Sequence, residues 1–307
     1  MPVELITCRS ALNRVDRMPF RWSLNPYRGC AHKCRYCYAR RSHAFFDLDL
    51  GRDFEEVIFA KLNIAEVLRA ELRRPSWRHE TIVIGTATDP YQPIEGRLRL
   101  TRHCLAVLAD AANPCSVTTK GTLVVRDRDI MQQLARETRF MVHISLITLD
   151  RDLWRRVEPG TPPPASRLRA LERLRAAGIP AGIFLAPILP GLTDSRAAIQ
   201  AVVQAAADHG AVAVWPGVLR LAPGLREWFI QFLRQEFPHL AASYERGYRG
   251  RADPPPAYRE QVLQRVGTAI ALTGLDHRSP PADPRPARVG WQYALPLDTV
   301  ARGTGRA

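Results

Sequence analysis

The segment that decides the fold spans residues 25–40, NPYRGCAHKCRYCYAR, and it holds three of the chain's six cysteines. Their spacing is Cys30-x3-Cys34-x2-Cys37, and no fourth cysteine lies nearby in the sequence. Unligated structural thiols are one explanation of this spacing, and a bound metal centre is another. A metal centre at this segment would have to use three thiolates and no more.

Two kinds of metal centre are compatible with the segment. A zinc site normally has four protein ligands, so completing one here would require His32, His43 or the distant Cys8. A [4Fe–4S] cluster also usually takes four thiolates. With three it keeps one iron open, and an open iron can bind and activate another molecule.

Beyond the cysteines, short apolar β-branched runs alternate with amphipathic stretches. We expect strands at 81–87, 115–120, 139–149, 179–189 and 211–219. We expect helices at 97–112, 127–138, 166–178, 194–210 and 224–237. Gly178 is placed as a glycine that stops a helix, and Asp194 as the N-cap of the next one.

This alternation predicts parallel strands joined by right-handed crossovers. With a first strand near the cysteines it gives five or six units, which favours a partial (β/α)6 barrel similar to a TIM barrel. An open doubly wound sheet is the alternative. In both architectures ligands bind at the carboxyl ends of the strands.

The composition changes toward the C-terminus, so we divide the chain at residue 240. Residues 1–240 are expected to form the core domain, with the cluster loop at 25–40. Residues 241–307 are expected to form a Pro/Arg-rich extension with one helical segment, 258–274, and a loosely ordered end.

Charge and composition limit the classes of function. The formal net charge is +14, and only three of the 44 basic residues are lysines, namely Lys33, Lys61 and Lys120. A positive balance is compatible with a nucleic-acid partner, but the arginines are spread along the chain. No run approaches the roughly 18–20 apolar residues of a membrane span, and no signal peptide is evident. The cysteine pattern is not an extracellular disulfide framework, so we expect a cytoplasmic protein.

The CxxxCxxC spacing, with Tyr36 before the last cysteine, resembles the signature of the radical S-adenosylmethionine (SAM) superfamily. The resemblance implies that Cys30, Cys34 and Cys37 ligate a single [4Fe–4S] cluster whose open iron is chelated by SAM. It also implies that one electron from the reduced cluster cleaves SAM to methionine and a 5′-deoxyadenosyl radical, which abstracts hydrogen from a substrate.

Residues 25–40 together with GTATDPYQPIEG (85–96) resemble the spore photoproduct lyase-like branch, often described as DNA repair photolyases. The resemblance covers roughly residues 20–220. It implies that Tyr36 packs near the adenine of SAM. The remaining contacts to SAM that it implies are oxygens offered to the amino group and two residues near the carboxylate: Thr86, Thr88 and Asp89 for the former, Lys120 and Ser145 for the latter.

The resemblance implies a radical SAM enzyme, lyase-like, acting on a nucleic-acid lesion or base, with DNA or RNA as partner and no membrane. An electron donor such as flavodoxin or ferredoxin is expected. Spore photoproduct lyase also uses a cysteine as hydrogen donor, and Cys104 and Cys115 match that role poorly. A radical SAM enzyme acting on a peptide or a small metabolite is the alternative, and a non-enzymatic zinc-binding module is a third hypothesis.

Overall fold

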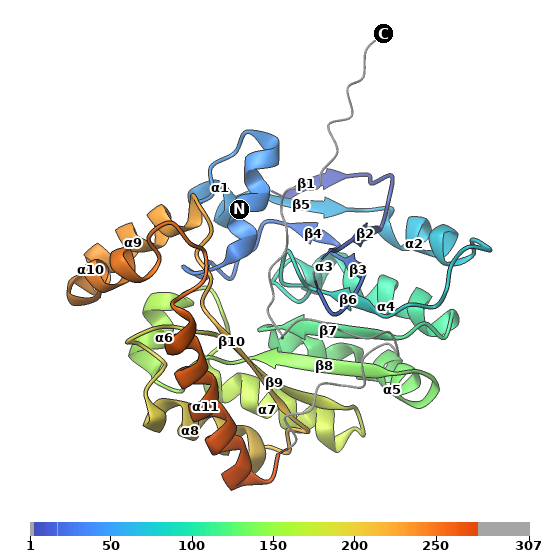
Figure 1. The fold of residues 1–307 in the computed structure, drawn as a ribbon. Coiled ribbons are helices and arrows are strands. Elements are labelled where there is room, and N and C mark those ends of the chain that lie inside the picture. Colours follow the sequence, from blue (N-terminus) through green and yellow to red (C-terminus); the bar gives the residue numbers. More distant parts are fainter. Residues whose placement is uncertain (1–2, 17, 276–307) are drawn as a thin grey trace.

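The computed structural model describes residues 3–16 and 18–275, and Figure 1 shows their arrangement. The main sheet has seven strands in the order β10-β9-β8-β7-β6-β3-β2. Their bounds are β2 Leu12–Arg14, β3 Trp22–Leu24, β6 Ile82–Ile84, β7 Cys115–Thr119, β8 Phe140–Ser145, β9 Ala181–Ile188 and β10 Val214–Val218. β2 pairs antiparallel with β3, and all the other neighbours in this sheet are parallel.

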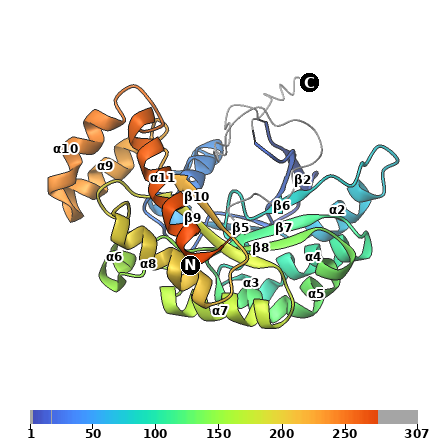
Figure 2. The same ribbon diagram turned by 60° about the horizontal axis from the view of Figure 1, so that its bottom comes forward.

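The strand order confirms the partial barrel. From β3 to β10 each new strand is added on the same side of the sheet, whereas a doubly wound sheet reverses direction at its switch point. The connecting helices therefore cover one face of the sheet, as Figure 2 shows. Those helices include α3 Glu95–Leu98, α4 Leu100–Asp110, α5 Arg128–Glu137, α6 Arg151–Val157, α7 Pro164–Ala176 and α8 Arg196–Asp208, with the 3-10 turn η2 Thr122–Asp127.

Side-chain alternation explains how the two faces of the sheet differ: one packs into the main core under the helices, and the other faces the barrel interior, where Phe184 and Trp215 form a smaller cluster. Along β7, Cys115, Val117 and Thr119 are buried while the residues between them are half-buried. On β8, Val142 and Ile144 belong to the main core. Because successive side chains on a strand point to opposite faces, Ser145 points to the other side, toward the barrel interior.

A second, three-stranded sheet lies beside the first strands of the barrel (Figure 1). It consists of β1 Val3–Ile6, β5 Ile58–Lys61 and β4 Tyr27–Arg28, in the order β1-β5-β4. The cysteine loop leaves β4 and leads into the 3-10 segment η1 Tyr38–Phe46, followed by α1 Arg52–Glu56, while α2 Ile64–Leu72 follows β5. This sheet anchors the start of the loop beside the main sheet.

The structure tests the two predicted helix-end signals, the glycine that ends α7 and the aspartate expected to begin α8. Gly178 follows the last residues of α7 with φ +76°, as a terminating glycine should. Asp194 is not the N-cap of α8: Ser195 is, and its Oγ accepts from the Ala198 N–H at 3.1 Å. The Asp194 carboxylate instead accepts from the Gly191 N–H at 2.9 Å and from the Tyr258 hydroxyl at 2.6 Å. The aspartate thus fixes the loop and a distant helix, which local pattern does not reveal.

The C-terminal part continues with α9 Leu225–Glu236, α10 Pro238–Gly247 and α11 Pro256–Thr273. α11 lies along α8 and β10, and its Val262, Val266 and Ile270 belong to the main core. The expected boundary at residue 240 thus falls within α10, and our domain division stays a prediction. The expected loose end falls at 276–307, outside the described residues. Among the described helices none is long and apolar enough to cross a membrane.

Candidate functional site

The three cysteines lie on one tight loop whose backbone is closely confined. Successive turns are closed by Lys33 N–H to Cys30 O at 3.4 Å and by Cys37 N–H to Cys34 O at 3.3 Å. Gly29 begins the loop at φ +75°, and a Cβ there would lie 2.4 Å from the Val57 carbonyl oxygen. Only glycine fits this position without strain. The loop therefore has one well-defined path.

A buried arginine holds this loop from behind. The Arg40 guanidinium is fully buried and donates to the Cys34 carbonyl at 3.0 Å and to the Leu50 and Gly51 carbonyls at 3.0 and 3.1 Å. It also pairs with Glu55 at 2.5 Å. Arg40 thus connects the middle of the cysteine loop to α1.

The segment after β6 clasps the other side of the cysteine loop. Thr88 Oγ1 donates to the Gly29 carbonyl at 2.6 Å. Gln92 donates from Nε2 to the same carbonyl at 3.1 Å and accepts from the Ala31 N–H at 3.0 Å. Gly85, at φ +93°, lets the segment pass close to β7, because a Cβ there would meet the Thr118 carbonyl oxygen at 2.4 Å. These bonds fix 85–92 and the cysteine loop as one unit.

Asp89 connects the 85–92 segment to the end of β7 through its carboxylate. One carboxylate oxygen accepts from Thr119 Oγ1 at 2.6 Å and from the Tyr91 N–H at 2.9 Å. The other accepts from the Lys120 N–H at 2.7 Å and lies 3.1 Å from His32 Nδ1, without hydrogen-bond geometry. Burial alone would raise the pKa of Asp89, but His32 and these donors hold it well below its usual value. Asp89 is therefore an anion.

Lys120 follows β7 and carries a cation into the site. Its Nζ lies 5.8 Å from the ring centre of Tyr36, and within the described part of the chain no carboxylate lies at ion-pair distance from it. Burial alone would lower the pKa of Lys120, but the nearby Cys34 and Glu158 raise it. The ammonium group is therefore charged and available to a ligand.

Behind the cysteines lies a buried ion pair. Glu158 and Arg167 are 1% and 0% exposed at the side chain, and Arg167 pairs with Glu158 at 2.5 Å. Tyr36 donates its hydroxyl proton to Glu158. Burial alone would raise the pKa of Glu158, but Arg167 and Lys120 lower it. Tyr36 is thus held by its hydroxyl, with its ring close to Lys120.

Burial also acts on the thiols. It raises the pKa of Cys34 to about 12 and that of Cys30 well above its usual value, and the neighbouring thiols add to both shifts. Three thiolates side by side in such surroundings repel one another and are poorly solvated. A bound cationic centre would offset both penalties. The loop is thus suited to hold metal as thiolate.

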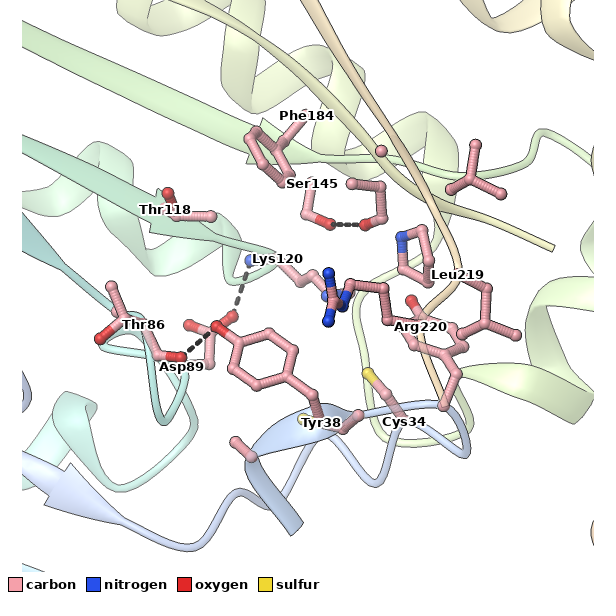
Figure 3. A pocket seen from close by; sticks show the side chains of 18 of the residues that line it. Cys34, Tyr38, Thr86, Asp89, Thr118, Lys120, Ser145, Phe184, Leu219 and Arg220 are labelled. Atoms are coloured by element: carbon pink, nitrogen blue, oxygen red, sulfur yellow. Dashed lines mark hydrogen bonds between the residues drawn. The ribbon is translucent and has the colours of Figure 1, made fainter. Parts of the chain in front are cut away.

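All nine predicted site residues line one pocket at the carboxyl ends of the barrel strands. They are the three cysteines with Tyr36, Thr86, Thr88, Asp89, Lys120 and Ser145. Figure 3 shows several of them converging, with the dashed contact of Ser145 Oγ to the Ala186 carbonyl, 3.5 Å long. The structure brings these residues together; their roles stay predictions.

Two further residues of the 85–96 motif, and the two cysteines considered as hydrogen donors, lie outside the pocket. Tyr91 and Glu95 bond to Asp127 and to Tyr27 within buried networks and do not line the pocket. Cys104 and Cys115 are buried in the main core, and burial raises the pKa of both thiols. Neither thiol faces the pocket.

Sequence reasoning missed the opposite wall of the pocket. That wall comes from the end of β10, from the segment before α11 and from the first turns of α11. It includes Pro216, Arg220, Asp253, Pro254, Arg259 and Leu263. The position of Arg220 just after a barrel strand was a usable signal. For Arg259 no local signal exists, because only the packing of α11 on α8 brings it to the pocket.

The zinc hypothesis needs a fourth ligand near the thiols. His32 lines the pocket, and its Nδ1 lies 3.1 Å from an Asp89 carboxylate oxygen. His43 Nε2 lies 3.2 Å from the Val57 carbonyl, and Cys8 lies in the small sheet region, where its N–H bonds to Asn63. Within residues 3–16 and 18–275, no group of three or more His, Cys, Asp or Glu side chains is arranged to hold a single metal ion. The same finding covers Cys30, Cys34 and Cys37, so it does not distinguish a zinc site from a cluster site.

Comparison with known proteins identifies a family to which this chain is similar. The family model described as "Radical SAM superfamily" matches residues 24–200. An uncharacterized protein of Mycobacterium tuberculosis is 42% identical over 295 residues, which cover 94% of this chain and 87% of that protein. An uncharacterized protein of Methanocaldococcus jannaschii is 28% identical over 189 residues, covering 62% and 68%.

Solved structures agree on the fold. Spore photoproduct lyase in complex with dinucleoside spore photoproduct matches with a TM-score of 0.68 at 15% identity, covering 88% of this chain and 79% of that one. A variant of that lyase, solved with bound AdoMet and dinucleoside spore photoproduct, matches with a TM-score of 0.67 at 14% identity and the same coverage. At such identity the likeness concerns the fold alone.

Proposed function

This chain belongs to the radical SAM superfamily, and we propose that it is a radical SAM enzyme whose cluster is held by Cys30, Cys34 and Cys37. The family implies a [4Fe–4S] cluster and SAM. The observation that carries the proposal is the loop itself: three unpaired thiols, confined by Gly29 and Arg40, open into one pocket with a charged lysine. When bound, the cluster and SAM supply reductive cleavage and a 5′-deoxyadenosyl radical.

The residues around the thiols have the chemistry to orient SAM. We assign Lys120 and Ser145 to its carboxylate, because a hydroxyl and a buried ammonium that has no ion-pair partner among the described residues suit an anion. Tyr36 is assigned to the adenine side. Its hydroxyl is occupied by Glu158, which leaves the ring as its contact surface.

The threonines and Asp89 are assigned to the amino group of SAM. The hydroxyl proton of Thr88 is already given to Gly29, so Thr88 can only accept. Asp89 meets three donors and His32, which leaves few lone pairs for an ammonium. We therefore propose that Asp89 acts chiefly through its charge and through the loop it fixes. Thr86 Oγ1 accepts from Asn25 and the Thr86 carbonyl accepts from Tyr38, so Thr86 would offer the remaining lone pairs of these oxygens.

For the substrate we propose a nucleic-acid lesion or base. Support comes from the net charge of +14 and from a fold shared with a lyase solved in complex with dinucleoside spore photoproduct. Lyase chemistry and DNA repair are part of this proposal. A peptide or a small metabolite is the alternative substrate, and binding of DNA or RNA that weakens steeply with salt distinguishes the two.

The reductant is proposed to be a small acidic electron carrier such as flavodoxin or ferredoxin. Arg35, next to Cys34, shares a surface groove with Arg155, Arg156 and Trp228. The Trp228 indole N–H donates to the Arg35 carbonyl at 3.1 Å, so the groove touches the cysteine loop directly. Six free cysteines fit a reducing, cytoplasmic setting.

The test is anaerobic reconstitution with iron and sulfide, reduction with dithionite and incubation with SAM. We expect 5′-deoxyadenosine from the wild type and none from Cys30→Ala, Cys34→Ala or Cys37→Ala. Cys8→Ser is the matched control, because Cys8 lies outside the pocket, and it should behave as wild type. A colourless protein that retains zinc and forms no 5′-deoxyadenosine would overturn the proposal.

A further inference from the structure

The wall of the pocket opposite the clasped cysteine loop carries two arginines from separate segments. Arg220 follows β10, and Arg259 lies in the first turns of α11. Both are half-buried, and both line the pocket. In Figure 3 the Arg220 guanidinium extends into the middle of the pocket. Neither residue has a place in the cofactor assignment above.

The backbone around Arg220 is fixed on both sides. The Leu219 carbonyl accepts from the Tyr248 hydroxyl at 2.9 Å, and the Leu221 N–H donates to the Ala252 carbonyl at 2.8 Å. The guanidinium itself pairs with Asp253 at 3.0 Å. This framework aims the side chain inward and shows that the end of β10 and residues 248–253 form one wall.

Arg259 is held in place by the anchoring of its helix. Tyr258 donates to the Asp194 carboxylate at 2.6 Å, and Arg265 donates to the Asp194 carbonyl at 2.7 Å. Arg265 is therefore structural. The Arg259 side chain makes no hydrogen bond or ion pair within the described residues. A guanidinium with five donors that faces a pocket from a fixed helix is poised for an external acceptor.

We assign the acceptor to the substrate and not to the carboxylate of SAM. Lys120 and Ser145 occupy the ends of β7 and β8, whereas Arg220 follows β10, with β9 lying between. Arg259, together with Arg220 and its partner Asp253, is thus assigned to the substrate. Arginine is the side chain best matched to phosphate, because its planar fork can donate two parallel hydrogen bonds.

We propose that Arg220 and Arg259 form a subsite for a backbone phosphodiester of a nucleic-acid substrate, with Asp253 positioning Arg220. The proposal rests on the proposed function, since it assigns a substrate contact within the same pocket. It makes the C-terminal extension part of the substrate site. One phosphodiester bridging both guanidiniums would place the adjoining nucleotide at the mouth of the pocket.

The experiment uses the full-length reconstituted protein and a fluorescein-labelled ten-nucleotide oligothymidylate, with affinity measured by anisotropy from 50 to 300 mM salt. We expect Arg259→Gln and Arg220→Gln each to weaken binding about tenfold and to lower the slope of log K against log salt by about 0.7 to 1. Arg259→Lys, which keeps the charge but not the fork, should lose less affinity than Arg259→Gln. The matched control is Arg136→Gln, an exposed arginine on α5 outside the pocket, which should bind as wild type.

A second probe identifies the recognised group. The same oligomer with an uncharged methylphosphonate backbone should bind at least tenfold more weakly than the phosphodiester. Wild-type binding that is absent, equal binding of both backbones, or unchanged affinity and salt slope in both arginine variants would each overturn the inference. Failure of the proposed function is recognised separately, by the absence of 5′-deoxyadenosine from the wild type without any oligonucleotide.

Discussion

Arg40 and Arg35 contact the same carboxylate from two sides, which allows a matched test of what holds the cysteine loop. The guanidinium groups of Arg40 and Arg35 contact Glu55 Oε1 at 2.5 and 3.1 Å, respectively. The Arg40 side chain is 0% exposed, and that of Arg35 is 30% exposed. Arg40→Met keeps most of the apolar stem while removing every hydrogen bond. Arg35→Met does the same on the solvent side.

The expected losses of stability differ because the Arg40 side chain is more deeply buried than that of Arg35. Arg40→Met leaves three carbonyls and the buried side of Glu55 without their donor. Breaking a buried pair costs about 3–5 kcal/mol, and the remaining partner Arg35 keeps the total near the middle of that range, about 4 kcal/mol. At about 2–4 °C per kcal/mol this lowers the melting temperature by roughly 10 °C. A half-exposed pair such as Arg35–Glu55 is worth about 0–1 kcal/mol.

The assay is thermal unfolding of both variants, followed with iron content after anaerobic reconstitution. Because Arg40 donates to the Cys34 carbonyl, we expect its variant to lose bound iron as well as stability, while Arg35→Met keeps both. Equal melting temperatures for the two variants, or full iron content in Arg40→Met, would refute the reasoning that the buried guanidinium holds the loop.

Three further predictions follow from contacts described above or adjoining them. Lys120→Met should weaken SAM binding by about 10- to 100-fold, since a charge-assisted contact is worth about 1.5–3 kcal/mol, and equilibrium dialysis measures it. His143 is buried against Trp215 at 4.4 Å between ring centres, and burial lowers the pKa of His143 to about 4. As the pH falls below about 6.5, the His143 imidazole is protonated in the unfolded chain before it is protonated in the folded one. The free energy of unfolding therefore decreases between pH 6.5 and 4, by about 3 kcal/mol at pH 4. In His143→Phe that part of the pH dependence should vanish from urea-unfolding curves, and a loss equal to that of wild type would contradict it. A Cβ at Gly160 would lie 2.2 Å from the Ala31 carbonyl, whereas one at Gly247 meets nothing within 4 Å. Gly160→Ala should therefore displace the cysteine loop and reduce bound iron, Gly247→Ala should not, and equal iron in both would show that the loop tolerates the displacement.

The barrel and its cofactor wall are readable from sequence because their signals are local. The expected strand at 115–120 is found as β7, and the expected helix at 166–178 as α7. Lys120 and Ser145 are placed together by the resemblance to the spore photoproduct lyase-like branch, and the structure places both in one pocket at the carboxyl ends of the strands. The cysteine spacing predicts the metal-binding loop, which lines the same pocket.

What the sequence could not give depends on tertiary packing. Aspartate is a residue type favoured at N-caps, but Ser195 takes that position, and Asp194 contacts Tyr258, 64 residues away in the chain. An arginine such as Arg259 is typical of a solvated helix face, and only the packing of α11 on α8 brings Arg259 to the pocket. In both cases the deciding neighbour is remote in sequence and carries no periodic pattern.

The pocket is assembled from opposite ends of the described chain, and this fixes an order during synthesis. The ribosome completes the three thiols at residue 37 long before it adds Arg220 and Arg259 to the facing wall. At about 5–20 residues per second, roughly 10–40 s separate residue 40 from residue 259. During that interval the nascent thiols have no far wall above them, so we expect them to be open both to oxidants and to whatever delivers iron and sulfide.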